Sequence, residues 1–576
     1  MTAPVTVPGR RVRRPSPAAE DVLGWAMVAV LVVLVGLPLL FVLLQGVAPG
    51  LGLVRGSVWR PELLAGIGDR PLWRTGLVNS LVLAGGAMVL GGALGTGLAL
   101  LRTGVSFPGA RLLDATAWIL LVSPSFVLAQ GWVLLASPSG IASGFGQDWV
   151  TALVLSPGGL VVIMSLTQYP LAYLAVSAAL RWDDRSHRHA AALSGAGPWT
   201  VLRTVRLPLL WPAVLSGAVL VFVDVLGDFG LPAALSTAYP FPTLPYAIYA
   251  SVRQSPVRFD SAGVLSFYLV VILIAAMLLY LWAVRRGARG ALTGTASRID
   301  PPPARRPARW TVLTAAVVGL TLVVPLGSSL LVSLSHNVSG GLTWSNLTFG
   351  HYHAAFAEGE LLIGARNSVL VAIAAAVLTT VLGFLCAVVL TSTGFRARVL
   401  VDLAGTVSLA VPGIVLAVGF IFVWNQPVLA SAGLALYGSP VLLVLAGVAS
   451  ALPVSVRLQV GALARLPGGF LAAAALSGAG FAARIRTVLV PLAGSAVVSA
   501  FVAVLAMGVF DLATTTMLAP PGFPTLPVVV LTEFDRGRYG YATAGAVLSA
   551  ALVLILAALA ARQGRRLEAA AREETR

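Results

Sequence analysis

Long apolar runs follow one another along this sequence with little room between them for a soluble domain. Each run has about 20 residues or more, the length that a helix needs to cross the hydrocarbon core of a bilayer. Only 10% of the residues are charged, against about 25% in a soluble protein. The runs are continuous rather than alternating, which excludes an outer-membrane barrel. The sequence therefore predicts an all-α polytopic membrane protein.

Twelve spans are expected, six on each side of a basic, proline-rich linker at 285–309. The linker divides a first domain (22–284) from a second (310–562), with tails at 1–21 and 563–576. In the first domain the predicted spans are 22–46, 77–101, 112–136, 150–179, 209–236 and 262–283. In the second they are 310–334, 367–391, 398–424, 440–462, 492–519 and 541–562.

Arginine supplies every basic side chain of this chain, whose net charge is +17. Its distribution over the loops predicts that both termini face the cytoplasm, and six spans per half make the two halves parallel repeats. Without lysine the chain cannot build a normal P-loop. No basic surface with aromatic platforms is visible for nucleic acid. The single cysteine, Cys386, excludes an internal disulfide, and no cofactor is expected.

Two short segments predicted on the cytoplasmic side repeat each other closely. Residues 190–208 read AAALSGAGPWTVLRTVRLP, and residues 473–491 read AAALSGAGFAARIRTVLVP. The offset of 283 residues recurs outside them, where Pro170 matches Pro453 and Asp228 matches Asp511. Further matches are the Asn-Ser pairs at 79 and 367 and the FPTLP segments at 241 and 523. Five matches in the same order indicate an internal repeat.

Each repeated segment predicts a helix, a glycine-containing turn and a second helix that ends at a proline. An exposed short helix of this kind can dock into a groove of a partner protein. The alternative is a plain connecting loop. Connecting loops vary freely, whereas these two copies are alike and most other loops of the two halves differ. Docking is therefore the favoured interpretation.

This pattern resembles the "EAA" coupling loop of permease subunits of binding-protein-dependent ABC importers. The resemblance covers nearly the whole chain, as two permease domains in one polypeptide. His189 and Ala472 stand where the family usually has glutamate, so one family contact to the ATPase is missing. The resemblance implies that the following residues couple to the ATPase: His189, Ala190, Ala191, Gly195, Gly197, Leu207, Pro208, Ala473, Ala474, Gly478, Gly480 and Pro491.

The family also implies the partners and the activity. Two copies of a separate cytoplasmic ATPase would grip the two loops, an extracytoplasmic solute-binding protein would deliver the substrate, and the chain itself would catalyse no reaction. The segments DFGLPAAL at 228–235 and TTTML at 514–518 are most similar to iron(III) permeases; thiamine and phosphonate-type importers are the alternatives. A secondary transporter is the rival of another class, but it predicts ion-coupling carboxylates near the midplane and no repeated cytoplasmic loop.

Several residues within the spans are candidates for the translocation pathway or its gate. An aspartate at the centre of a membrane helix costs about 2.5–3.5 kcal/mol to insert, but Asp228 lies 20 residues after Pro208 and so is expected near the outer end of its span, where water relieves that cost. Its match with Asp511 makes both, with the neighbouring Phe229, candidates for the pathway or the outer gate. The alternative is that they are ordinary polar residues at helix ends. Asp224 has no acidic counterpart and ranks lower. Pro170 and Pro453 are expected to kink their spans, which fits a pathway or simple packing equally well.

Two other segments carry tempting chemistry. His351, Tyr352 and His353 could suggest a metal site, but residues two apart do not share a helix face, so no metal is expected there. The segment DRGRYG at 535–540 is expected to be a solvated outer loop.

Overall fold

A computed structural model describes residues 17–51, 59–138, 140–144, 146–180, 193–236, 238–290, 302–340, 343–357, 359–467 and 469–552, with residues 555 and 562. Every regular element in these ranges is a helix. Within them, nine helices are long and apolar enough to cross a membrane, or eleven if each of two sharply bent pairs counts as one span. The polytopic helical fold is confirmed. The predicted count of twelve is not reached, and part of the last predicted span lies outside the described residues.

The first half of the chain, residues 17–290, contains six main helical units. They are α1 with α2 (Pro17–Leu31, Leu37–Val47), α3 (Pro71–Gly104), α4 with α5 (Ala110–Val122, Ser125–Ala136), α8 (Pro157–Leu180), α11 with α12 (Leu207–Gly227, Gly230–Leu235) and α14 (Phe259–Gly290). The shorter α13 (Leu244–Arg253) precedes α14.

The second half, residues 302–562, repeats this order. Its helices are α15 with α16 (Pro307–Val318, Val324–Ser333), α18 (Glu360–Ser392), α19 with α20 (Arg398–Ala410, Gly413–Trp424), α22 (Pro440–Leu463), α26 with α27 (Gly494–Val509, Leu512–Leu518) and α28 (Leu526–Asp535). Residues 539–552 then form the start of the last helix.

Two predicted spans are broken rather than continuous, so the predictions of unbroken helices over 112–136 and 398–424 are wrong. The chain leaves the helical conformation at Ser123 (ψ 128°) and at Val411 (ψ 115°). Each is followed by a proline, which disfavours a helical conformation in the preceding residue. The second break turns the helix axis by 113°. The predicted spans 209–236 and 492–519 are interrupted as well, because α11 ends at Gly227 and α26 ends at Val509. The chain also bends by 75° between Leu492 and Gly494, at the start of the second of these spans.

Hydrogen bonds deep in the fold are duplicated between the halves. In the first half, the Asn79 side-chain amide donates to the Pro242 carbonyl at 2.9 Å, and the Leu244 N–H donates to the Ser80 hydroxyl at 2.7 Å. The second half repeats both bonds at 2.9 and 2.8 Å, from Asn367 to Pro524 and from Leu526 to Ser368. The matching asparagine–serine pairs of the sequence therefore tie matching FPTLP segments to the second span of each half.

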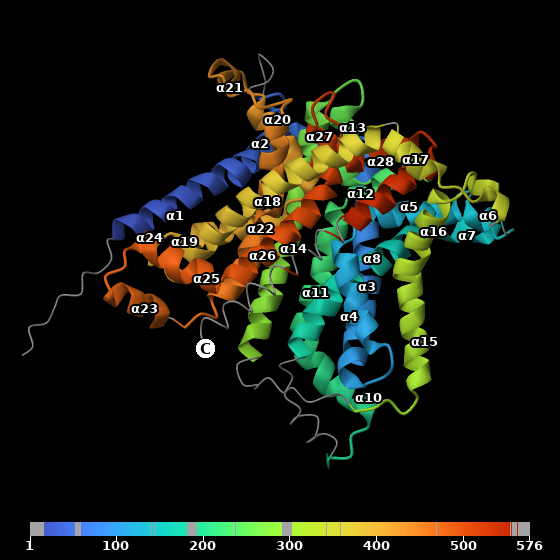
Figure 1. The fold of residues 1–576 in the computed structure, drawn as a ribbon, viewed down its shortest axis with the longest axis horizontal. Helices are drawn as coiled ribbons and strands as arrows, with labels where there is room; N and C mark the ends of the chain where they lie inside the picture. The colour runs from blue at the N-terminus through green and yellow to red at the C-terminus, as the bar shows by residue number, and fades with distance from the viewer. Residues whose placement is uncertain are drawn as a thin grey trace, which may run out of the picture.

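The first helices of the two halves are exchanged (Figure 1). Helix α1 packs on α18 and α19 of the second half, whereas α15 packs on α4 of the first half. Both helices carry a π-helical turn at the matching place, Val32–Gly36 in one and Gly319–Val323 in the other. Trp25 meets Phe395 edge-on at 5.6 Å, within an apolar cluster that joins α1 to the second half.

Two glycines permit the exchanged helices to cross closely. A Cβ atom at Gly131 of α5 would lie 2.0 Å from the Pro325 carbonyl oxygen of α16, and one at Gly419 of α20 would lie 2.6 Å from that of Pro38 in α2. Real Cβ atoms do not approach so closely, because such overlap is strongly repulsive. Only glycine fits at these two crossings, which join the halves at equivalent places.

Candidate functional site

The second repeated loop folds as predicted, as two helices joined by a glycine turn. Helix α23 (Gly469–Leu476) ends in a Schellman motif, in which the Ala479 N–H donates to the Ala474 carbonyl at 3.0 Å and the Gly478 N–H donates to that of Ala475 at 3.1 Å. Gly478 has φ +84°, a left-handed conformation that strongly favours glycine. The chain then continues through α24 (Phe481–Arg484) and a π-helical turn (Ile485–Leu489) to α25 (Val490–Leu492), which contains Pro491.

The first repeated loop has the same geometry where the structure describes it, from residue 193 onward. Gly195 has φ +83°, and α10 (Pro198–Val201) continues through a π-helical turn (Leu202–Arg206) into α11, which begins with Leu207 and Pro208. The Val201 N–H donates to Gly197 at 3.0 Å, and the Arg484 N–H donates to Gly480 at the same distance. The predicted coupling residues His189, Ala190 and Ala191 lie outside the described residues.

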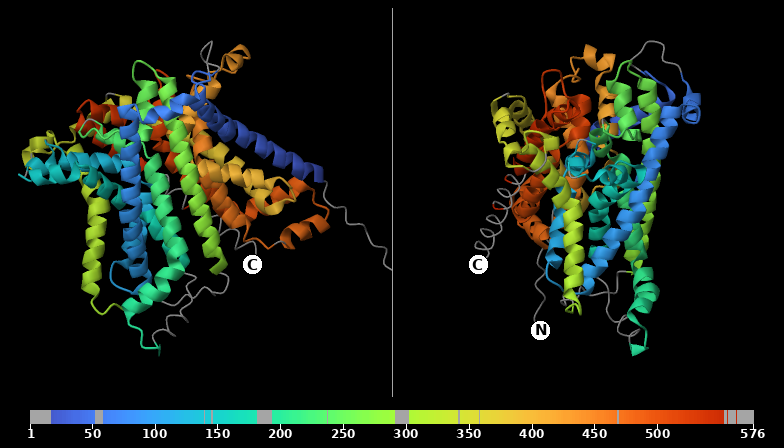
Figure 2. Two further views of the ribbon diagram at one scale, coloured as in Figure 1. Left: turned by 180° about the vertical axis from the view of Figure 1, so that it is seen from behind. Right: turned by 90° about the vertical axis from the view of Figure 1, so that its right-hand side faces the viewer.

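Both loops lie at the same end of the molecule, away from α13 and α28 (Figures 1 and 2). Each exposes a large apolar side chain at the matching position: Leu193 is 90% exposed and Leu476 is 71% exposed. Trp199 on α10 is also 70% exposed. A single exposed leucine on a protein surface is common, but here a leucine is exposed at the same position of both loops. The loops are therefore suited to apolar contact with a partner.

An ion pair that no sequence motif indicated ties the second loop to the N-terminal helix. The Arg484 guanidinium lies 3.8 Å from the Glu20 carboxylate, and the side chains are only 11% and 16% exposed. The second Glu20 oxygen accepts the Gly394 N–H at 2.9 Å. The counterpart of the Gly394 contact in the first half is a backbone pairing between the segment after α3 and the segment before α15, in which the Ser106 N–H donates to the Pro302 carbonyl at 2.8 Å.

Asp228 and Asp511 occupy equivalent breaks in the fifth unit of each half. Each carboxylate caps the short helix that follows it: Asp228 accepts from the Leu231 N–H at 3.2 Å, and Asp511 accepts from the Thr514 N–H at 3.1 Å. Asp228 also accepts the Ser125 hydroxyl of α5 at 2.9 Å, whereas Asp511 accepts the hydroxyl of Thr514 itself. Both carboxylates thus stabilise helix breaks beside the boundary between the halves.

The packing around the two breaks is complementary. In the first half α5 supplies Ser125 and α12 supplies Gly230, where an added Cβ would lie 2.4 Å from the serine hydroxyl. In the second half α20 supplies Gly413, and a Cβ there would lie 3.5 Å from Ala513 of α27. The glycine is thus on the fifth unit in the first half and on the third unit in the second half. An added side chain would clash at Gly230 but would make an ordinary van der Waals contact at Gly413.

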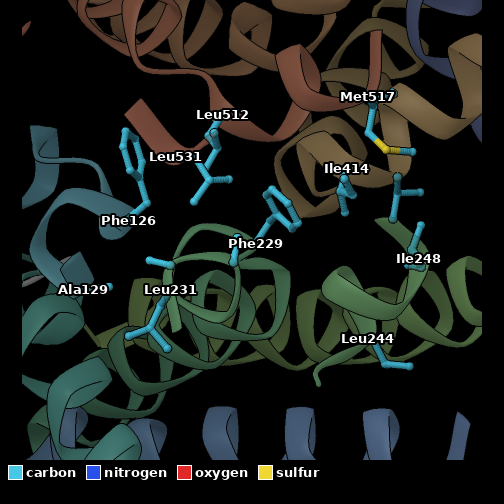
Figure 3. Close-up of a cluster of buried hydrophobic side chains, with 14 of the residues drawn as sticks. Phe126, Ala129, Phe229, Leu231, Leu244, Ile248, Ile414, Leu512, Met517 and Leu531 are labelled. Carbon is cyan, nitrogen blue, oxygen red and sulfur yellow. The ribbon is translucent and has the colours of Figure 1, made fainter. Parts of the chain in front are cut away.

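Apolar side chains from both halves close the space beside these breaks (Figure 3). Phe229 is 3% exposed and lies among Leu231, Ile414, Leu512 and Met517, which are 4% exposed or less. The Phe229 ring also packs against Tyr249, with ring centroids 5.1 Å apart. We call this cluster the apolar plug. It shuts the boundary between the halves at the level of the two aspartates.

Pro170 and Pro453 lie inside helices that continue past them, α8 and α22, and both are buried. They adjoin the closest contacts of these helices with the second span of each half. A Cβ at Gly95 would lie 2.5 Å from the Tyr169 carbonyl oxygen, and one at Gly383 would lie 2.3 Å from the Ser455 hydroxyl. Their place favours a part in packing, whereas Asp228, Phe229 and Asp511 lie beside the plug.

The histidine segment and the arginine loop come together in space. His351, on α17 (Gly350–Ala357), is hydrogen-bonded through Nε2 to the Ser335 carbonyl at 3.0 Å. It lines a cavity of about 380 Å³ with His336 and Arg538. Within the described ranges, no three His, Cys, Asp or Glu side chains are placed to hold a metal. The 535–540 loop is partly anchored, because Arg536 and Arg538 pair with the buried Glu533 at 2.6 and 3.1 Å.

The chain is similar to permease proteins of known transport systems. Residues 89–289 match the family model described as "Binding-protein-dependent transport system inner membrane component". The molybdenum transport system permease protein ModB of Escherichia coli K12 is 31% identical over 218 residues, which cover 37% of this chain and 94% of that protein. The ferric transport system permease protein FbpB of Actinobacillus pleuropneumoniae is 23% identical over 516 residues, which cover 87% of this chain and 73% of that protein.

Among solved structures, a bacterial ABC transporter involved in the import of the acidic polysaccharide alginate shows a distant likeness. Its chain is 17% identical to this one, with a TM-score of 0.34 over 42% of this chain and 86% of its own length. This likeness is too distant to support an argument about the fold.

Proposed function

The chain belongs to the binding-protein-dependent transport system inner membrane components and is the permease of an ABC importer, and from this premise we propose that it carries iron(III) across the bacterial cytoplasmic membrane. The observation that carries the choice of substrate is the extent of likeness. The ferric permease aligns with 87% of this chain. A relative that aligns with both halves is more informative about a two-domain permease than one that aligns with a single half.

Molybdate is the second candidate, because ModB is more nearly identical to this chain, at 31%. Its alignment, however, covers only 37% of the chain. An oxyanion and a ferric ion make opposite electrostatic demands on the pathway, so the two candidates can be separated by experiment.

The proposed assembly has two permease domains, 22–284 and 310–562, with both termini in the cytoplasm. One ATPase subunit docks on each coupling loop, 183–208 and 464–491, so that two copies bind one chain. The exposed Leu193 and Leu476 support this docking, as do the left-handed Gly195 and Gly478, which hold the two turns in the same shape. ATP hydrolysis belongs to that partner. A solute-binding protein delivers the substrate at the opposite end.

Transport in this proposal requires the apolar plug to open. Movement of the two coupling loops toward each other would rotate α11, which continues directly from the first loop, and α26, which follows the second loop after a 75° bend between Leu492 and Gly494. Their far ends carry Asp228, Phe229 and Asp511, so rotation would separate the two breaks and part the plug. The family's glutamate is replaced by His189 and Ala472, so apolar and backbone contacts of the loops carry the coupling.

The test reconstitutes the full chain in proteoliposomes with the ATPase and the solute-binding protein encoded beside it. ATP-dependent uptake of ⁵⁵Fe(III) from the loaded binding protein is the expected result, and [⁹⁹Mo]molybdate serves as the second substrate. Uptake driven by an ion gradient without ATP would point to a secondary transporter. ATP-dependent uptake of molybdate and not of iron would overturn the choice of substrate alone.

A further inference from the structure

We propose that Asp224 is the residue of this permease that contacts the transported cation after it has passed the apolar plug. This inference rests on the proposed import of a cation. It concerns a position that neither the coupling loops nor the two helix breaks require.

Asp224 is exposed although it lies inside a membrane span. It belongs to the span Trp199–Gly227, one turn before the end of α11, and its side chain is exposed. A carboxylate inside a membrane is expensive unless it faces a water-filled space or an opposite charge. The direction in which Asp224 faces therefore decides its role.

The packing of α11 shows that Asp224 faces the boundary between the halves. Residues three apart lie on one side of a helix, and Gly227 is three residues after Asp224. At Gly227 an added Cβ would lie 2.9 Å from the Pro412 ring of the second half. The opposite side of α11, which carries Val219 and Leu226, is buried, and α11 packs on α3, α8 and α14 of its own half. Asp224 thus lies on the side turned toward the second half, one turn nearer the coupling loops than the plug.

No protein group satisfies this carboxylate in the described part of the chain. Asp114 and Asp402 ion-pair with arginines, and Asp228 and Asp511 accept hydrogen bonds. For Asp224 the described residues supply neither kind of contact. A carboxylate without a protein partner on the inner side of the plug offers oxygen ligands and, when ionised, a negative charge that favours a cation passing that point over an oxyanion.

The internal repeat supplies a second, independent observation. The equivalent position in α26 is Met507, which is 45% exposed. The equivalent position is therefore exposed in both halves, but only one half places a carboxylate there. The carboxylate of Asp224 is therefore not needed for packing, because the uncharged Met507 occupies the equivalent position of the second half.

Because positions 224 and 507 are equivalent, the carboxylate can be moved from one half of the chain to the other. Uptake of ⁵⁵Fe(III) from the loaded solute-binding protein is measured in proteoliposomes for Asp224→Asn and for the double variant Asp224→Met/Met507→Asp. The charge-matched control is Asp148→Asn, at the exposed start of α7 (Asp148–Val154). Stimulation of the ATPase by the binding protein reports correct assembly of each variant.

We expect Asp224→Asn to lower iron uptake at least about tenfold, since one short-range charge contact in a poorly screened site exceeds that factor, while ATPase stimulation persists. The relocated charge should restore uptake to within about threefold. Equal uptake by Asp224→Asn and Asp148→Asn would overturn the inference, as would a relocated variant no better than Asp224→Asn. Failure of the wild type to import iron would instead overturn the proposed substrate, and the cation contact with it.

Discussion

The turn at Gly478 offers the most direct test of how the coupling loops keep their shape. A Cβ atom at Gly478 would meet nothing within 4 Å, so substitution by alanine introduces no clash. The left-handed φ of +84° remains, and it costs an alanine about 1–2 kcal/mol. That cost corresponds to a roughly 5- to 30-fold shift toward the open turn. Asparagine tolerates this conformation better, so Gly478→Asn should lie between alanine and the wild type.

Gly480 is the matched control, because it also has open space around its Cα atom but a φ of −65°. Hydrogen exchange of the purified full chain, corrected for intrinsic rates, reports the amides of residues 478 and 479, which donate to Ala475 and Ala474. We expect these amides to exchange roughly 5- to 30-fold faster in Gly478→Ala and at an unchanged rate in Gly480→Ala. Equal effects of the two substitutions would refute the reasoning from backbone conformation.

Two further predictions concern how the helices of one half are held by the other. Glu20→Gln should destabilise the chain by about 1–3 kcal/mol, because it leaves the poorly exposed Arg484 without its charge partner; a double-mutant cycle with Arg484→Gln measures the coupling, and simple additivity would contradict it. Gly131→Ala should cost about 3 kcal/mol or more by overlap with the Pro325 carbonyl oxygen, whereas Gly97→Ala, in open space within α3, should not lower the thermal unfolding temperature, because alanine favours a helix interior over glycine.

The sequence predicted the class of fold and the duplication because both depend on local properties. Apolar runs identify membrane helices without knowledge of their neighbours, and the offset of 283 residues aligned Asp228 with Asp511 before their equivalent helix caps were visible. The coupling turns were predictable for the same reason, since Gly195 and Gly478 mark a left-handed conformation in a short segment.

The broken spans could also have been predicted, but hydropathy concealed them. Pro124 and Pro412 stand within apolar runs, and a window that averages hydrophobicity passes over both. The chemical signal was the effect of proline on the residue before it. Pro170 and Pro453, in contrast, lie within continuous helices. A proline alone therefore does not determine whether a helix breaks; the surrounding packing also contributes.

Contacts between distant segments could not be predicted from one sequence. Nothing in the residues around Glu20 indicates that its carboxylate meets Arg484, more than 460 positions later. The part of Ser125 in holding Asp228 was missed for the same reason. Such contacts depend on which helices become neighbours, and the exchange of first helices between the halves determines that here.

The exchange of first helices also has a consequence for synthesis of the chain. Helix α1 enters the membrane first, yet the surface on which it packs belongs to α18 and α19. Those helices emerge from the ribosome about 340 residues later, which takes roughly 20–70 s at about 5–20 residues per second. During that interval Met27 and Leu31, nearly inaccessible in the finished protein, face lipid. The first half is thus inserted as an open structure, and the protein closes only when its second half arrives.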